Sequence, residues 1–99
     1  MIDLAKITGF DWDDGNARKN AKHEVSTAES EQVFFNVPLL LLVDVKHSVQ
    51  EPRLHALGKS DPGRLLHVTF TLREAGVKIR VISARDMHRK ERMIYEQAT

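Results

Sequence analysis

The chain has 99 residues, which is enough for one small domain, residues 1–99, with a thin hydrophobic core. Its 29% of charged and 41% of hydrophobic residues are typical of a globular protein and exclude a disordered or fibrous chain. It has no cysteine, which excludes disulfide bonds and thiolate chemistry. The longest apolar stretch, Val37–Val43, is much shorter than the roughly 20 residues that cross a bilayer, and the first residues lack the pattern of a secretory signal. We therefore expect a soluble cytoplasmic protein.

Positive charge is concentrated in the C-terminal part of the chain. Residues 1–63 hold seven Lys/Arg and ten Asp/Glu, a net charge of −3, whereas residues 64–99 hold eight and four, a net charge of +4. Six of the eight basic residues in the second part are arginines. Such a cluster is typical of a local phosphate-binding site, but a solvated protein surface has the same composition, so both interpretations stay open.

Two helices are predicted near the N-terminus. The apolar–acidic alternation of Phe10–Asp13 is typical of an edge strand, after which a weak helix is expected over residues 13–23. Ser26, followed three residues later by Glu29, forms a capping box, which predicts a second helix from there to about residue 35.

Four strands are predicted in the next part of the chain, at residues 39–45, 53–58, 65–72 and 77–83. The first reads as a buried strand because it is continuously apolar, and the third alternates between an aliphatic and a mixed set of side chains. In the fourth strand Lys78 and Arg80 are expected to point outward. Short loops between the strands imply an antiparallel meander.

A C-terminal helix is predicted to follow, capped by Asp86 and running to about residue 96. Helical periodicity gives it an apolar face made of Met87, Ile94 and Ala98, with Tyr95 at its flank. The predicted fold is therefore α+β, with two N-terminal helices, a four-stranded antiparallel sheet and a C-terminal helix.

Several separated blocks of the sequence match one family pattern in the right order. They are Phe10-Asp11-Trp12-Asp13, Asn20–His23, Arg53–Ser60, Gly63–Thr71, Ile79–Arg85, Arg89–Arg92 and Tyr95-Glu96. Together they resemble the BrnT family over roughly residues 9 to 96, and such a series is more specific than any single short motif. The sequence departs from the family pattern at Glu24, Thr27, Pro52 and Leu54. Glycine is common in the family at the first of these positions. We expect the departures to change local geometry and to leave the fold intact.

The resemblance to the BrnT family implies a fold like that of the RelE ribonucleases. It implies a toxin that cleaves RNA and inhibits translation until an antitoxin neutralises it. The implied antitoxin is a ribbon–helix–helix, BrnA-like protein, and operator DNA would be contacted only through it. No membrane partner is expected.

Cleavage of RNA without a metal moves the 2′-hydroxyl onto the adjacent phosphorus, which requires a base and positive charge on the developing pentacoordinate phosphate. Arginine suits the second task because its planar fork binds two phosphate oxygens at once. The predicted catalytic residues are Arg80, Arg64, Arg85 and His47, and the predicted RNA-binding residues are Arg53, Lys22, His23 and Arg89. Arg80 ranks first because a rigid strand holds a side chain better than a loop does.

Each of these residues also has a structural interpretation. Arg80 and Arg53 suit surface ion pairs, Arg64 a solvated turn, Arg85 a brace where the last strand meets the last helix, and Arg89 a solvated helix face. Among the histidines, the order of candidates for proton transfer is His47, His23, His67 and His55.

No metal site or cofactor is expected, because the sequence has no cysteine, no H-E-x-x-H motif and no histidine pair four residues apart. Two functional hypotheses remain. The first is a metal-independent endoribonuclease toxin, and the alternative is a non-catalytic BrnT-fold module that binds a protein partner or RNA. Convergence of Arg64, Arg80 and Arg85 on one groove would favour the enzyme. Their pairing with Asp44, Glu51 or Asp61 would favour the module.

Overall fold

The computed structural model of this chain describes residues 4–12, 24–47 and 51–99. The helix predicted for residues 13–23 lies outside these ranges, and so do Lys22 and His23. Two short 3₁₀ helices, η1 at Leu4–Lys6 and η2 at Val45–His47, flank the first two strands of the described chain.

A five-stranded mixed sheet forms the centre of the fold. Its order is β1-β5-β4-β3-β2, with bounds Gly9–Phe10, Leu40–Val43, Leu54–Lys59, Leu65–Arg73 and Lys78–Asp86 for β1 to β5. The predicted antiparallel meander of β2 to β5 is confirmed. An edge strand is present near the predicted Phe10–Asp13, as β1, but it pairs with β5 in parallel. The prediction of a four-stranded antiparallel sheet is therefore wrong, because the sheet is five-stranded and mixed. The backbone amide of Thr8 donates to the Val77 carbonyl and that of Asp11 to the Ile79 carbonyl, each at 2.8 Å. A short alternation in the sequence does not specify this partner strand or its direction.

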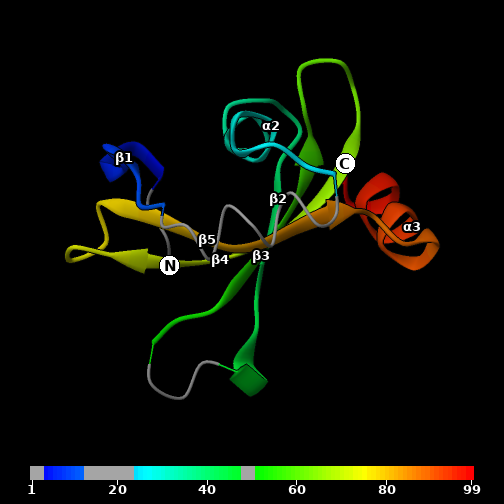
Figure 1. Cartoon of the computed structure of the whole chain (residues 1–99). Helices are drawn as coiled ribbons and strands as arrows, with labels where there is room; N and C mark the ends of the chain where they lie inside the picture. The colour runs from blue at the N-terminus through cyan, green and yellow to red at the C-terminus, as the bar shows by residue number, and fades with distance from the viewer. Residues whose placement is uncertain (1–3, 13–23, 48–50) are drawn as a thin grey trace.

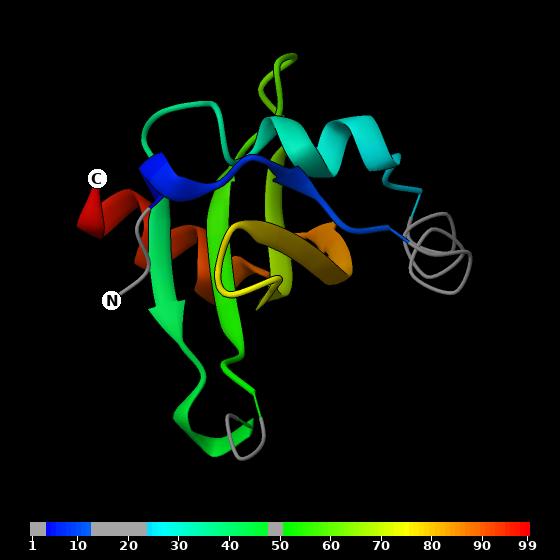
Figure 2. The same cartoon turned by 90° about the vertical axis from the view of Figure 1, so that its left-hand side faces the viewer.

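β2 is an edge strand and not the buried strand that its apolar run predicted. It pairs only with β3, and at its end Leu42 and Val43 are 39% and 66% exposed. A continuous apolar run is typical of a strand covered on both faces, whereas β2 lies at the outer edge of the sheet with α3 behind it (Figure 2).

The helix α2 spans Thr27–Gln32, and its start is as predicted. The Ser26 hydroxyl accepts a hydrogen bond from the backbone amide of Glu29 at 3.0 Å, which satisfies one of the amides that a helix start leaves unpaired. The helix ends at Gln32, three residues earlier than expected, because the amides of Phe34 and Phe35 bond to the third residue before them and tighten the chain into turns.

The helix α3 spans Arg89–Ala98, and its cap is His88 instead of the predicted Asp86. Asp86 still belongs to β5, where it pairs with Leu66. The buried anchor of α3 is Tyr95, only 5% exposed, whereas Ile94 of the predicted apolar face is 38% exposed. The Tyr95 hydroxyl donates to the Pro38 carbonyl at 2.5 Å, and burial raises its pKa.

A β-bulge interrupts the pairing of β4 with β5. Thr69 pairs with Ser83 while Phe70 pairs with Val81, so Ile82 is an extra residue on β5. Side chains of a strand alternate between faces, and one extra residue reverses that alternation. Ala84 therefore joins the core face that Val81 also serves, and Arg85 lies opposite His67 on the other face.

The two faces of the sheet carry different clusters. The larger one joins aliphatic and aromatic side chains of β3, β4 and β5 to residues that flank α2, among them Val25 and Val33. The smaller one joins Leu57 to Met87 and Tyr95 beside and within α3. The two helices therefore lie on different sides of the sheet, as Figure 1 shows.

Gly58 of β3 packs closely against the segment that follows α2, so a substitution at this position tests that packing. A Cβ at this position would lie 2.9 Å from Val33 Cγ1 and 3.4 Å from the Val33 carbonyl oxygen. We expect Gly58→Ala to lower the free energy of unfolding by about 1–3 kcal/mol, because the segment after α2 must shift. Gly9→Ala is the control, since its Cβ would meet only the flexible end of Lys78. Urea denaturation measures both, and equal effects would contradict this packing.

Candidate functional site

Arg64, one of the predicted catalytic residues, joins three elements. Its guanidinium donates to both carboxylate oxygens of Asp86 at 2.7 and 3.0 Å, and to Glu29 of α2 at 3.1 Å. These contacts raise the pKa of Arg64 and lower that of Asp86, in each case chiefly through their shared hydrogen bonds. Arg64 is therefore not the solvated turn residue of its structural interpretation, since it links α2 to β5 at the start of β4.

The same guanidinium also accounts for one departure from the family pattern. Glu24 adopts a positive φ of 58°, a conformation that favours glycine. Its carbonyl accepts a hydrogen bond from Arg64 at 2.8 Å, which holds the strained turn in place. The departures at Pro52 and Leu54 also leave the fold intact. The Pro52 carbonyl accepts from the Thr71 hydroxyl, and Leu54 is buried in the larger cluster.

Arg80, the first-ranked candidate, points away from the core as predicted, on the strand position opposite Thr71. Its guanidinium donates to the carboxylate of Asp11, just after β1, at 3.3 Å. Arg64, Arg80 and Arg85 therefore do not converge on one groove. Each of them is paired with an acid, although not with any of the three acids that the sequence suggested.

A cavity of about 570 Å³ opens between α3 and the sheet face that carries the smaller hydrophobic cluster. Its apolar wall consists of Leu42, Leu57 and Ile94, and its polar lining consists of Asp44, His55, His67, Thr69, Arg85, Lys90 and Glu91. The strand register explains why these polar side chains lie close together. His55 lies opposite Thr69, and His67 lies between Leu57 and Arg85 in a row that crosses three strands.

Asp44, His55 and Thr69 form a chain of hydrogen bonds at one side of the cavity. His55 Nε2 lies 3.0 Å from an Asp44 carboxylate oxygen, and Nδ1 lies 3.0 Å from the Thr69 hydroxyl. An ionised carboxylate only accepts hydrogen bonds, so in the neutral ring the proton belongs on Nε2. Nδ1 is then an acceptor that faces a hydroxyl donor.

The His67 ring packs against that of His55 at an angle of 38°, with 4.8 Å between ring centroids. It is only 9% exposed, and its Nδ1 has no hydrogen-bond partner among the described residues. Burial, aided by the charge of Arg85 and by His55, lowers the pKa of His67 to about 4 despite the opposing charge of Glu91. The imidazole is therefore neutral at neutral pH.

Arg85 and Glu91 close the other side of the cavity. Two guanidinium nitrogens of Arg85 donate to the two carboxylate oxygens of Glu91, each at 2.8 Å. Burial opposes ionisation of Glu91, but hydrogen bonds from Arg85 and from the His88 amide outweigh it and lower the pKa to about 2. The pair is bidentate, and the lowered pKa keeps the Glu91 carboxylate ionised at neutral pH.

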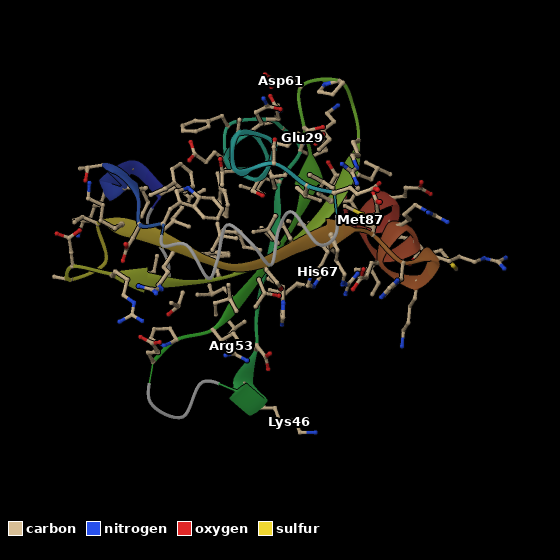
Figure 3. The ribbon with its side chains drawn as sticks, viewed as in Figure 1. Glu29, Lys46, Arg53, Asp61, His67 and Met87 are labelled. Atoms are coloured by element: carbon tan, nitrogen blue, oxygen red, sulfur yellow. The ribbon has the colours of Figure 1, made fainter. Side chains whose placement is uncertain are left out.

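Among the described residues, Arg89 and Arg53 do not line this cavity. Arg89 is exposed at the start of α3. Arg53 precedes β3, where its carbonyl accepts from the Asp44 amide, and His47 is the last residue of η2. In Figure 3, Arg53 and Lys46 lie toward one end of the molecule and Asp61 toward the other, with His67 between them.

Sequence reasoning ranked His67 and His55 last and did not select Asp44, Thr69, Lys90 or Glu91. The signal in the sequence that points to the cavity is the mixed face of the strand over 65–72, which carries His67 and Thr69 on the side opposite the aliphatic set. Within the described ranges, no group of three or more His, Cys, Asp or Glu side chains is placed to hold a metal ion. No helix in those ranges is long and apolar enough to span a membrane.

The five-stranded mixed sheet between α2 and α3 defines a small α+β domain. Its cavity gathers two imidazoles, a guanidinium and an ammonium. The model of the family "ribonuclease toxin, BrnT, of type II toxin–antitoxin system" matches residues 12–91. The chain belongs to this family, so it is a ribonuclease toxin with a cognate antitoxin, and the resemblance of its sequence blocks is confirmed. No curated protein matches the chain individually.

The lowered pKa of His67 predicts how stability depends on pH. The imidazole has a pKa of about 4 when folded and 6.5 when unfolded, so the unfolded chain binds more protons between these values. Stability should be fully present above about pH 6.5 and should fall as the pH approaches 4. Urea midpoints across this window measure the effect.

His67→Gln is the control for this pH dependence, because it removes the titrating ring while keeping a polar side chain. Its urea midpoint should change less between pH 6.5 and 4. Glu91 adds a loss of the same sign only below its ordinary pKa of 4.5. Parallel pH profiles for the two proteins would show that His67 is not the responsible group.

Proposed function

We propose that the cavity between the sheet and α3 is the RNA-cleaving site of this toxin, and that cleavage needs no metal ion. The observation that carries the proposal is the gathering of His55, His67, Arg85 and Lys90 in one space of about 570 Å³. These groups supply the positive charge and the proton acceptors that metal-free cleavage requires.

The reaction starts with attack of a 2′-hydroxyl on the adjacent phosphorus, which forms the 2′-O–P bond and breaks the P–O5′ bond. It yields a 2′,3′-cyclic phosphate and a 5′-hydroxyl, the base taking the proton of the 2′-hydroxyl and the leaving 5′-oxygen taking one from water. His55 is the proposed base, because Asp44 fixes its tautomer and leaves Nδ1 as an acceptor. In this structure the Thr69 hydroxyl donates to Nδ1. The 2′-hydroxyl would therefore either take the place of the Thr69 hydroxyl or pass its proton to Nδ1 through that hydroxyl.

Arg85 is the proposed contact to the phosphate. Charge-assisted hydrogen bonds from a guanidinium stabilise the two oxygens that gain charge in the transition state. Lys90, exposed on α3 at the cavity, adds a second positive charge. Arg89 and Arg53 would extend the RNA contact beyond the cavity. Arg64 and Arg80 would instead act through the fold, because they pair with Asp86 and Asp11.

The wider role follows from family membership and is also a proposal. RNA cleavage would inhibit translation in the cytoplasm until the antitoxin neutralises the toxin. The antitoxin would be a ribbon–helix–helix, BrnA-like protein, through which the complex contacts operator DNA. His47 is a further proposed catalytic residue, and Lys22 and His23 are further proposed RNA contacts.

One observation favours the alternative function, a non-catalytic module that binds a protein or RNA. All three arginines expected to hold the scissile phosphate are paired with carboxylates, and a paired arginine binds an anion less readily. The two functions differ in one property, since only the enzyme cleaves RNA in purified form.

Arg85→Ala tests the assignment of the site. We expect it to lower the rate of RNA cleavage by about 10²–10³-fold, the usual effect of removing a group that stabilises transition-state charge. Arg92→Ala on the exposed face of α3 is the matched control and should cleave as the wild type does. Circular dichroism confirms that each variant is folded. Cleavage by Arg85→Ala at the wild-type rate would place the site elsewhere, and an inactive wild type would favour the module.

Metal independence is tested separately with the purified wild-type chain. Cleavage of a single-stranded RNA should proceed unchanged in excess EDTA, because the described residues supply the base and the positive charge themselves. The products should carry 2′,3′-cyclic phosphate ends. Loss of activity in EDTA, restored by a divalent cation, would contradict the proposal.

A further inference from the structure

The carboxylate of Glu91 lies where three anion-binding groups meet. It accepts two hydrogen bonds of 2.8 Å from Arg85 and one of 2.8 Å from the backbone amide of His88. The His88 amide donates to Oε1 of Glu91, whereas His67 Nε2 lies 3.7 Å from Oε2, which also accepts from Arg85 Nη2. One side chain from the first turn of α3 is thus surrounded by a guanidinium, a helix-start amide and an imidazole.

Each of these groups binds phosphate in proteins when no carboxylate is present. A guanidinium binds two phosphate oxygens with the same paired geometry that it uses for a carboxylate. The amides at the start of a helix point at an anion and add the positive end of the helix dipole. His67 faces the same carboxylate with Nε2 at 3.7 Å and has a side chain only 11% exposed, and a neutral ring protonated on Nε2 donates to an anion at that place.

The alternative is that Glu91 serves only as the cap of α3. A cap requires one contact, the hydrogen bond from the His88 amide. It does not require a bidentate arginine from β5 or a position against a buried histidine in the cavity. These additional contacts brace the junction of β5 with α3, and they are also the contacts that an anion site uses.

We propose that Arg85, the His88 amide and His67 form a phosphate-binding site that the Glu91 carboxylate occupies in this structure, so that an RNA phosphodiester must displace Glu91 to bind. The identity of the ligand as RNA rests on the proposed function, while the anion site itself does not. The toxin described here is then in a closed state, and any movement of the first turn of α3 changes its affinity for phosphate.

Glu91→Gln tests the proposal, because the amide keeps a similar shape and can still accept from His88 but no longer competes as an anion. Inorganic phosphate, titrated by NMR or calorimetry, should bind this variant about tenfold more tightly than the wild type. In the wild type phosphate must compete with the Glu91 carboxylate for the hydrogen bonds of Arg85 and the His88 amide. A short oligonucleotide that cannot be cleaved, with 2′-deoxy sugars, should gain affinity in the same direction.

Two controls separate displacement from a general change of charge. Glu96→Gln removes the same charge from the exposed part of the same helix and should leave phosphate affinity nearly unchanged. The double variant Arg85→Ala/Glu91→Gln should lose the gain, because its main anion-binding group is absent. An equal gain in Glu96→Gln, or a gain that persists without Arg85, overturns the proposal.

A second measurement covers the case in which Glu91→Gln disturbs the start of α3. When phosphate is added to the folded wild type, the Arg85 Nε–H and the His88 amide resonances should shift together at high phosphate concentration. Absence of any shift at both groups overturns the proposal. Binding of inorganic phosphate is measured without RNA, so an inactive toxin would refute the proposed function and leave this inference standing.

Discussion

The structure depends on one extra residue in β5. Ile82 bulges out of the pairing with β4, and the alternation of side chains reverses beyond it. Without the bulge, Arg85 would point into the apolar core beneath α2, because it would share the face of Ile79 and Val81. With the bulge, Ala84 fills the core and Arg85 faces the histidines. One backbone irregularity therefore separates a buried core from a polar cavity on a single strand.

The cavity follows from that separation together with the strand register. His67 lies directly opposite Arg85, and His55 directly opposite Thr69, so cross-strand pairing brings four chemically active side chains together. The helix α3 completes the site from outside the sheet through Glu91, and Tyr95 fixes the helix by its hydrogen bond to Pro38. Strands supply rigid positions, whereas the helix supplies the group that can be exchanged for a ligand.

Local signals in the sequence predicted part of this structure. The Ser26 cap, the strands β3 to β5 and the family membership could all be predicted, because capping, alternation and motif order act over a few residues each. The bulge at Ile82 could not be predicted, since nothing in the apolar run marks an extra residue. The pairing of Arg64 and Arg80 with Asp86 and Asp11 also escaped prediction, because contacts over 22 and 69 positions depend on the complete fold. The sequence alone therefore favours the arginines over the histidines of β3 and β4 as site residues.

The most direct test of the central claim is a map of RNA contact on the folded toxin. A 2′-deoxy oligonucleotide that binds without being cleaved is titrated into isotopically labelled protein, and the shifts of backbone and side-chain resonances are recorded. The account predicts that shifts concentrate at His55, His67, Thr69 and Arg85 and at the start of α3, and that the aromatic side chains packed beneath α2 do not respond. Shifts centred on the other face of the sheet, or on Arg64 or Arg80 with a silent cavity, would contradict it.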